Sequence, residues 1–433
     1  MMTRRRFALF AAALAVASAP RADTIQTSST TMLNAGQDYR AGSVQTAVPA
    51  YEMVDISATD VKTPYTDNLE ITLSTWGAFD AGNNVRFWQN GALATDNRLS
   101  GDINLAFVRA DFFDRTLTLR VGRQMVADGV ARMLQIDGGE LELKLPAGFG
   151  VSGYAGTPVQ PRFQALGGPY TVGNTEATFV TGTRVFWRYA GLLDVGTSVA
   201  IATDRGDVSR QDVGADFRFT PTQMLTFVGS GWWSLYEDRI GEASLSAIVS
   251  PVRQLDVTLD YRHVEPDLFL PRNSILAVFA ADKRNDLGGA VHWGAMKNLG
   301  VDADYHVLLE EGAGTGHWAR LKGTLHPGVN STVGAEASYL HEPENGYTLA
   351  RLFGSKTLQA ITGTLDLYAY FFERTVNGED KTLQATATLG YDIARGWRAL
   401  VAGTAGATAY LSDQFQIMAK LVYNETYIAR EVR

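Results

Sequence analysis

The feature that most constrains the fold of this chain is a repeated alternation of apolar and polar residues. Between Leu255 and Arg262 every odd position is apolar and every even position is polar, so a β-strand there has one apolar and one polar face. The same period occurs over 69–79, 299–307 and 383–393, and weaker copies follow along most of the chain. No helical period is sustained over a comparable length. The sequence therefore predicts an all-β fold.

Short and long connections alternate between the predicted strands. Pro, Gly and Asp indicate tight turns at 113–115, 146–148, 190–191, 220–222, 250–251, 326–328 and 395–396. The longer connections are 80–98, 127–136, 158–174, 265–283 and 342–356. Short turns at one end and longer loops at the other are typical of bacterial outer-membrane barrels. The chain length fits a transmembrane antiparallel up-and-down β-barrel of about 18 strands, within a range of about 16–20.

The alternation alone does not show which face points inward, because a soluble sandwich or propeller has the same period. Three features favour the membrane barrel. The expected strands are longer than the roughly 5–6 residues of strands in soluble sheets. The polar faces carry charges of both signs, which suit a wet interior. Aromatic residues stand near the turns, where interfacial girdles form, at Trp187, Tyr189, Phe217, Phe219, Tyr261, Trp293, Tyr391 and Tyr423.

The chain divides into four segments. Residues 1–22 predict a signal peptide, with Arg4, Arg5 and Arg6 before a short apolar stretch. The adjacent arginines also fit a twin-arginine export signal. Removing this segment lowers the net charge from −8 to about −12, which argues against nucleic acid as a partner. We expect an extended periplasmic segment over 23–66, the barrel over 67–425 and a polar tail over 426–433.

The layout resembles that of single-chain bacterial outer-membrane porins over roughly residues 65–425. The best last strand carries Phe415, Ile417, Ala419, Leu421 and Tyr423. The polar tail after it departs from the terminal aromatic residue that such barrels usually carry. The segments Tyr51–Val54 and Trp76–Asp80 are also weakly similar to barrels of myxobacterial type, some of which are thought to pass secreted polysaccharide. The resemblance implies a bacterial outer-membrane location, lipids and lipopolysaccharide as surroundings, and the barrel-assembly machinery as a partner.

Several residues do not fit a simple barrel pattern. Arg109 and Arg123 fall on the apolar stripe by strict counting, so a bulge or a strand end near the headgroups is expected there. The segments 274–280 and 348–354 precede clear strands and are either additional strands or apolar loops. The loop 265–283 either folds into the lumen as a constriction or packs on the rim or a neighbouring subunit.

The search for catalytic chemistry finds little. The absence of Cys excludes disulfides, thiolate metal sites and cysteine nucleophiles. The six histidines form no metal-binding spacing, and no nucleophile elbow is present, so we expect no metal, no cofactor and no enzymatic activity. His306 near Asp304 and Asp302 is the best starting point for a catalytic triad, and a solvated ion pair in the lumen is the alternative interpretation.

The polar faces hold the candidate pore-lining residues. They are Arg184, Arg188, Asp216, Arg218, Asp256, Asp260, Arg262, Asp302, Asp304, Arg320, Lys322, Glu336 and Asp366, with Lys420 as a further member. The aromatic residues on the same faces are Trp76, Tyr154, Trp232, Tyr236, Tyr368 and Tyr370, which either stack on sugar rings or fill space near the rim. Rows of opposite charge facing one another orient water and ions in a pore.

The sequence thus indicates a passive outer-membrane channel for hydrophilic solutes or for a secreted polysaccharide, with periplasmic export proteins as candidate partners. The main alternative is a structural or interaction barrel of an envelope complex that uses its extracellular loops. A hydrolase of the outer membrane is a third hypothesis. The solute and the oligomeric state are not specified by any motif.

Overall fold

The computed structural model describes residues 22–40, 43–61, 63–82, 88–89, 92–93, 99–127, 129–131, 134–159, 179–204, 206–269, 283–343 and 345–428. The expected signal peptide, the segment 274–280 and most of the expected loops 80–98, 158–174 and 265–283 lie outside these residues. Among the described residues, no helix has the length and apolar character needed to cross a membrane.

Nearly all described residues belong to strands. The strands are β1 (Ala22–Arg40), β2 (Ser43–Ala47), β3 (Pro49–Val61), β4 (Asn68–Asp80), β5 (Trp88–Gln89), β6 (Ala92–Leu93), β7 (Leu99–Phe112), β8 (Leu117–Val126), β9 (Leu134–Lys144), β10 (Phe149–Pro158), β11 (Phe179–Tyr189), β12 (Leu193–Asp204), β13 (Asp207–Thr222), β14 (Leu225–Ser234), β15 (Arg239–Val252), β16 (Leu255–Val264), β17 (Arg284–Met296), β18 (Leu299–Glu310), β19 (Gly314–Gly328), β20 (Ser331–His341), β21 (Gly346–Leu358), β22 (Ile361–Val376), β23 (Glu379–Ala394), β24 (Trp397–Ala407) and β25 (Gln414–Ile428). Short 3-10 turns are η1 (Gly129–Ala131), η2 (Pro146–Gly148) and η5 (Pro266–Phe269).

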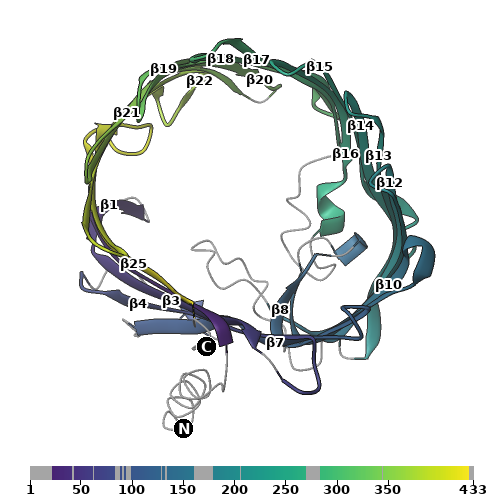
Figure 1. The fold of residues 1–433 in the computed structure, drawn as a ribbon. Coiled ribbons are helices and arrows are strands. Elements are labelled where there is room, and N and C mark those ends of the chain that lie inside the picture. The colour runs from purple at the N-terminus through teal and green to yellow at the C-terminus, as the bar shows by residue number, and fades with distance from the viewer. Residues whose placement is uncertain are drawn as a thin grey trace.

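All of these strands except β5 and β6 form one closed antiparallel ring (Figure 1), and β5 and β6 pair with each other in a separate sheet. Neighbours in the chain pair with one another, and β25 pairs with β1 over Thr24–Gly36 to close the sheet. Strands β2 and β3 both pair with β1, and they do so in one continuous register. We therefore count β2 and β3 as one barrel strand, next to β1. The barrel therefore has 22 strands, and the expected number of about 18 is wrong.

The error in the strand number has identifiable causes. Residues 22–40 and 43–61 are barrel strands, so the barrel begins well before residue 67 and the expected periplasmic segment over 23–66 is not observed. The segment 348–354 also lies within a strand, β21. The first strand escapes pattern recognition because it is rich in Ser and Thr on both faces, and alternation of apolar residues is then too weak to detect.

The two ends of the barrel differ as expected. The connections are short at the end where β1 begins and β25 ends, and the long connections after β4, β10 and β16 lie at the other end. The second end also carries tight turns, such as the two residues between β22 and β23. Three of the tight turns lie two or three residues later in the chain than predicted, at 223–224, 253–254 and 329–330. Pro221, Pro251 and Pro327 precede them and lie where the strand register shifts. Proline has no N–H to donate to the ladder, so it is confined to such irregular positions.

The outer surface of the barrel is apolar. Leu259 and Leu389 are each 60% exposed, and other large apolar side chains of the same register around the ring are exposed as well. Outward aromatic residues include Tyr391 and the pair Trp397 and Tyr423, whose ring centroids are 4.7 Å apart. An apolar band of this kind with aromatic side chains is stable in lipid rather than in water. The chain is therefore a transmembrane β-barrel with its polar faces turned inward.

The two arginines on the apolar stripe are accommodated in different ways. The pairing of β4 with β7 shifts its register between Ser74 and Thr75 of β4. Beyond this shift the side chains of β7 change faces, so Arg109 points into the barrel and forms ion pairs with Glu70 and Asp111. The expected bulge is thus present. Arg123 remains on the outward face of β8, near the end of that strand. There its Nε lies 2.6 Å from Oδ1 of Asp137.

Candidate functional site

The inner wall of the barrel is the candidate functional site. The register of the strands places every expected pore-lining residue on the face opposite the exposed apolar side chains. Strands bring these residues together across the sheet, since directly opposed side chains are about 4.5–5.5 Å apart. Most of the inward charges consequently form ion pairs between neighbouring strands.

One group of ion pairs lies on β16 to β19. Nε of Arg320 donates to Oδ2 of Asp304 at 2.8 Å, and Asp302 pairs with Nδ1 of His292 at 2.6 Å. Nearby, Nη2 of Arg262 lies 2.9 Å from Oε1 of Glu242. Each of these contacts joins side chains of two adjacent strands and leaves them in contact with the lumen.

His306 does not pair with the carboxylates that the sequence placed beside it. Its Nδ1 lies 2.8 Å from Oδ1 of Asp286 on the adjacent strand β17, and 3.4 Å from Oδ2 of Asp260 on the next strand, β16. Residues two apart on one strand are separated by about 6.6 Å along it, whereas cross-strand neighbours are closer. The expected grouping of His306 with Asp302 and Asp304 is therefore corrected to a cross-strand cluster.

A second group is centred on Arg351 of β21. Its guanidinium makes a two-point contact with Asp366, at 2.8 Å through Nε and 2.6 Å through Nη2, and Nη1 lies 3.4 Å from Glu336. The guanidinium carbon also lies 5.1 Å from the ring centre of Tyr368. Lys322 faces the same region, with Nζ 5.7 Å from the ring centre of Phe353.

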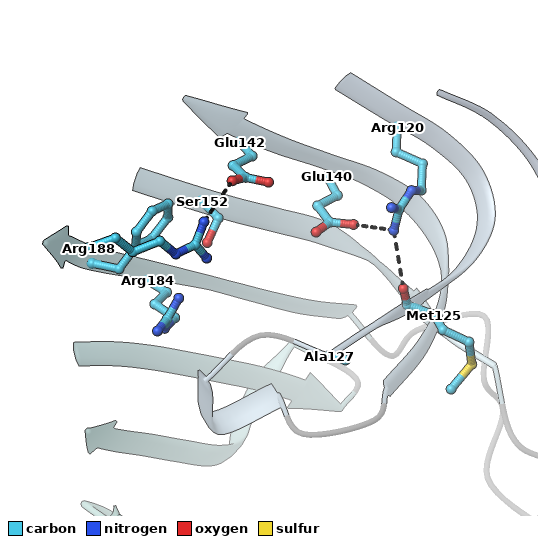
Figure 2. A pocket seen from close by; sticks show the side chains of 9 residues that line it. Arg120, Met125, Ala127, Glu140, Glu142, Ser152, Arg184 and Arg188 are labelled. Atoms are coloured by element: carbon cyan, nitrogen blue, oxygen red, sulfur yellow. Dashed lines mark hydrogen bonds and ion pairs between the residues drawn. The ribbon is translucent and has the colours of Figure 1, made fainter. Parts of the chain in front are cut away.

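Arginines from β8 and β11 form a third group around a cavity of about 230 Å³ (Figure 2). Arg184 is 8% exposed and binds Asp216 through Nε and Nη2, at 3.0 and 2.5 Å. Arg188 binds Asp194 at 3.1 Å, and Arg120 binds Glu140 at 2.9 Å. The cavity is lined by Arg120, Met125, Ala127, Glu140, Glu142, Ser152, Arg184, Phe186 and Arg188.

The remaining expected residues also face inward, with less contact between them. Arg218 stands opposite Asp194, Asp256 accepts a hydrogen bond from the hydroxyl of Ser250, and Lys420 stands opposite Met32. Among the aromatic residues, Trp76, Tyr154 and Trp232 are buried against the inner wall. These three fill space rather than line an open path, which favours the structural interpretation of their role.

Sequence reasoning missed several inward charges, above all Arg351, Asp286 and Glu242. Arg351 lies in a stretch whose alternation is weak, and this stretch predicts either a loop or an additional strand. Asp286 is the third residue of β17 and lies close to the end of an expected loop. The signal that would have identified both is the pairing register, which depends on the neighbouring strands.

Two short turns fold against the inner wall. The backbone N–H of Val130 in η1 donates to Oγ of Ser198 at 3.0 Å, and Val130 packs with Ala200, Trp232 and Leu268 of η5. Figure 1 shows η5 on the inner side of the ring beside β16. The first residues of the loop 265–283 thus enter the barrel, as the constriction hypothesis requires, and both turns narrow the lumen from one side.

Gly129 allows η1 to dock, because a Cβ at this position would lie 2.2 Å from Oγ of Ser198 and its φ is +53°. Gly129→Val is therefore expected to detach η1 and to raise the single-channel conductance. Gly323→Val is the matched control, since a Cβ there meets open space. Limited proteolysis of the folded barrel checks the detachment independently. Unchanged conductance and cleavage in Gly129→Val would show that η1 does not narrow the path.

The sequence matches no protein-family model and no curated protein. The fold is similar to the translocation pore of the P pilus usher PapC, with 10% identity and a TM-score of 0.46 over 93% of this chain and 100% of that chain. It is also similar to Pseudomonas aeruginosa OccK8 (OprE), with 10% identity and a TM-score of 0.46 over 94% and 98%. Acinetobacter baumannii OccAB4 has 9% identity and a TM-score of 0.43 over 94% and 100%. At such low identities, the function has to be inferred from the geometry of the barrel itself.

Proposed function

We propose that this chain is a passive, non-enzymatic channel of the bacterial outer membrane for small hydrophilic solutes. The observation that carries the proposal is the solvent exposure of inward-facing charges. The side chains of Arg262 and His292 are 59% and 55% exposed although the register directs both into the barrel. Water therefore reaches the inner wall, as a channel requires.

The size of the ring supports the same proposal. Barrels of about eight strands fill their interior with side chains, those of about 16–18 strands leave an aqueous channel, and transporters of about 22 strands are wide enough to hold a plug in the lumen. With 22 strands, this barrel is in the wide class. In the described part of the chain, η1 and η5 narrow one side, along β12 to β16.

The charges on the inner wall suggest which class of solute passes through the lumen. Arginine and carboxylate groups alternate around the wall, so they favour polar or zwitterionic solutes over apolar ones. Passage of a secreted polysaccharide is a narrower version of this proposal, supported by Tyr368 and Tyr370 on the inner face of β22. Lipids and lipopolysaccharide, the barrel-assembly machinery and, for a polysaccharide, periplasmic export proteins are the partners we propose.

Single-channel recording in planar bilayers tests the proposal. The purified barrel is expected to give steady, stepwise currents. Arg320→Glu with Lys322→Glu is expected to shift the reversal potential in a KCl gradient toward cation selectivity, because four units of charge change on the inner wall. Arg253→Glu with Lys297→Glu makes the same change in the tight turns and is the matched control.

One result would contradict the channel, and a second would contradict its path along β19. A folded barrel, identified by faster migration in unboiled SDS gels, that carries no current would favour an interaction barrel acting through its loops. Selectivity that is unchanged by the double substitution on the inner wall would place the conducting path away from β19.

A further inference from the structure

The inner wall holds a cluster of metal-ligating side chains. Asp260 of β16, Asp286 of β17 and His306 of β18 each offer one ligand atom, and these atoms all lie within 4.8 Å of one another. We propose that this cluster binds a divalent transition-metal ion of the Zn²⁺ class on the wall of the lumen. The site is independent of whether the channel conducts, and it goes beyond the proposed function.

The spacing of the ligand atoms suits a tetrahedral ion. Bonds of about 2.0–2.1 Å to nitrogen and oxygen require ligand atoms about 3.3 Å apart. Nδ1 of His306 lies 2.8 Å from Asp286 and 3.4 Å from Asp260, close to that value on both sides. The two carboxylate oxygens lie within 4.8 Å of each other, and a bound ion would draw them closer together. Water from the lumen would take the fourth position.

The histidine is held in place by its surroundings. A Cβ on Gly288 would lie 2.5 Å from Cγ and Nδ1 of His306, so only glycine leaves room for the ring against the wall. On its other side the ring packs on Trp318, with centroids 5.1 Å apart and a tilt of 43°. The side chain of His306 is 12% exposed, and those of the two carboxylates are 26% and 24% exposed. The ligands are therefore positioned before any ion arrives.

The neighbouring cations leave the cluster available. Arg262 is directed to Glu242, and Arg320 is directed to Asp304. Arg284 approaches Asp286 through the other oxygen, Oδ2, at 3.7 Å, so Oδ1 remains turned toward His306. Two carboxylates thus share one imidazole, and a divalent cation would balance their charge.

The donor set selects the kind of metal. One imidazole nitrogen and two carboxylate oxygens suit Zn²⁺, Co²⁺ or Ni²⁺, whereas Mg²⁺ and Ca²⁺ prefer oxygen ligands alone. Three protein ligands and one exchangeable position are typical of an accessible zinc site. We therefore expect Zn²⁺ and Co²⁺ to bind and Ca²⁺ to bind far more weakly.

Metal binding to the full-length barrel in detergent tests the proposal. Co²⁺ is expected to give the visible absorption of tetrahedral coordination, and Zn²⁺ is expected to displace it at one equivalent. Removal of a ligand in His306→Ala or Asp286→Asn is expected to weaken Zn²⁺ binding by at least about ten-fold, since even indirect ligand support is worth 10–100-fold. His292→Ala is the matched control, because His292 contacts a single carboxylate, that of Asp302.

The outcomes are distinguishable from those of the channel proposal. Absorption and calorimetry report binding whether or not the barrel conducts, and gel mobility reports folding. Folded wild-type protein without cobalt absorption, or equal Zn²⁺ binding by wild-type and His306→Ala protein, would overturn the site. The cluster would then be an ion pair between a protonated histidine and two aspartates.

Discussion

Replacing Leu365 with arginine is expected to destabilise the barrel by about 2–4 kcal/mol, the cost of a cation on the lipid face near the bilayer midplane. Leu365 is 48% exposed on the outer face of β22, opposite Gly354 and Ala387 of the adjacent strands. Lipid tails cannot hydrate a guanidinium, so the folded state loses stability while the unfolded state does not. Equilibrium urea unfolding from lipid vesicles measures the change.

Thr364→Arg is the matched control for this prediction. Thr364 is the preceding residue on the same strand and faces the lumen, opposite Ser355 and Thr388. An arginine there remains in water, so we expect a change below about 1 kcal/mol. If the effects of the two substitutions were reversed, the apolar face would be the interior and the membrane barrel would be wrong.

Removing the guanidinium of Arg351 is expected to have the second large effect. The carboxylates of Asp366 and Glu336 would lose their shared cation. Breaking a buried pair costs about 3–5 kcal/mol, and partial hydration here reduces the expected loss in Arg351→Ala to about 1–3 kcal/mol. The two uncompensated negative charges should also increase cation selectivity.

Adding Glu336→Gln and Asp366→Asn to Arg351→Ala removes those charges and should restore much of the stability and the original selectivity. Arg398→Ala is a second comparison, because Arg398 lies 3.5 Å from Asp392 and both side chains are well exposed. An exposed pair is worth about 0–1 kcal/mol. Equal losses in Arg351→Ala and Arg398→Ala would show that the cluster around Arg351 makes no special contribution.

The side of the sheet on which each residue lies could be read from the chain alone. A strand turns successive side chains to opposite faces, so the assignment of Asp302, Arg320 and Glu336 to one face needs only their positions relative to neighbouring apolar residues. The same local rule identifies the outward Leu259 and Leu389. The all-β fold and the inward set of charges were therefore predictable without any knowledge of the partners.

The number of strands and the pairing of charges required the tertiary structure. The strand over 22–40 shows little apolar alternation, and its place is set by hydrogen bonds to β3 and β25. Arg109 faces inward only because the register shifts between Ser74 and Thr75. Likewise, His306 meets Asp286 and Asp260 rather than Asp304, since contact depends on the register between strands. Alternation fixes which face a residue occupies, whereas the exact register between two strands also depends on turn geometry and on bulges, which the alternation does not show.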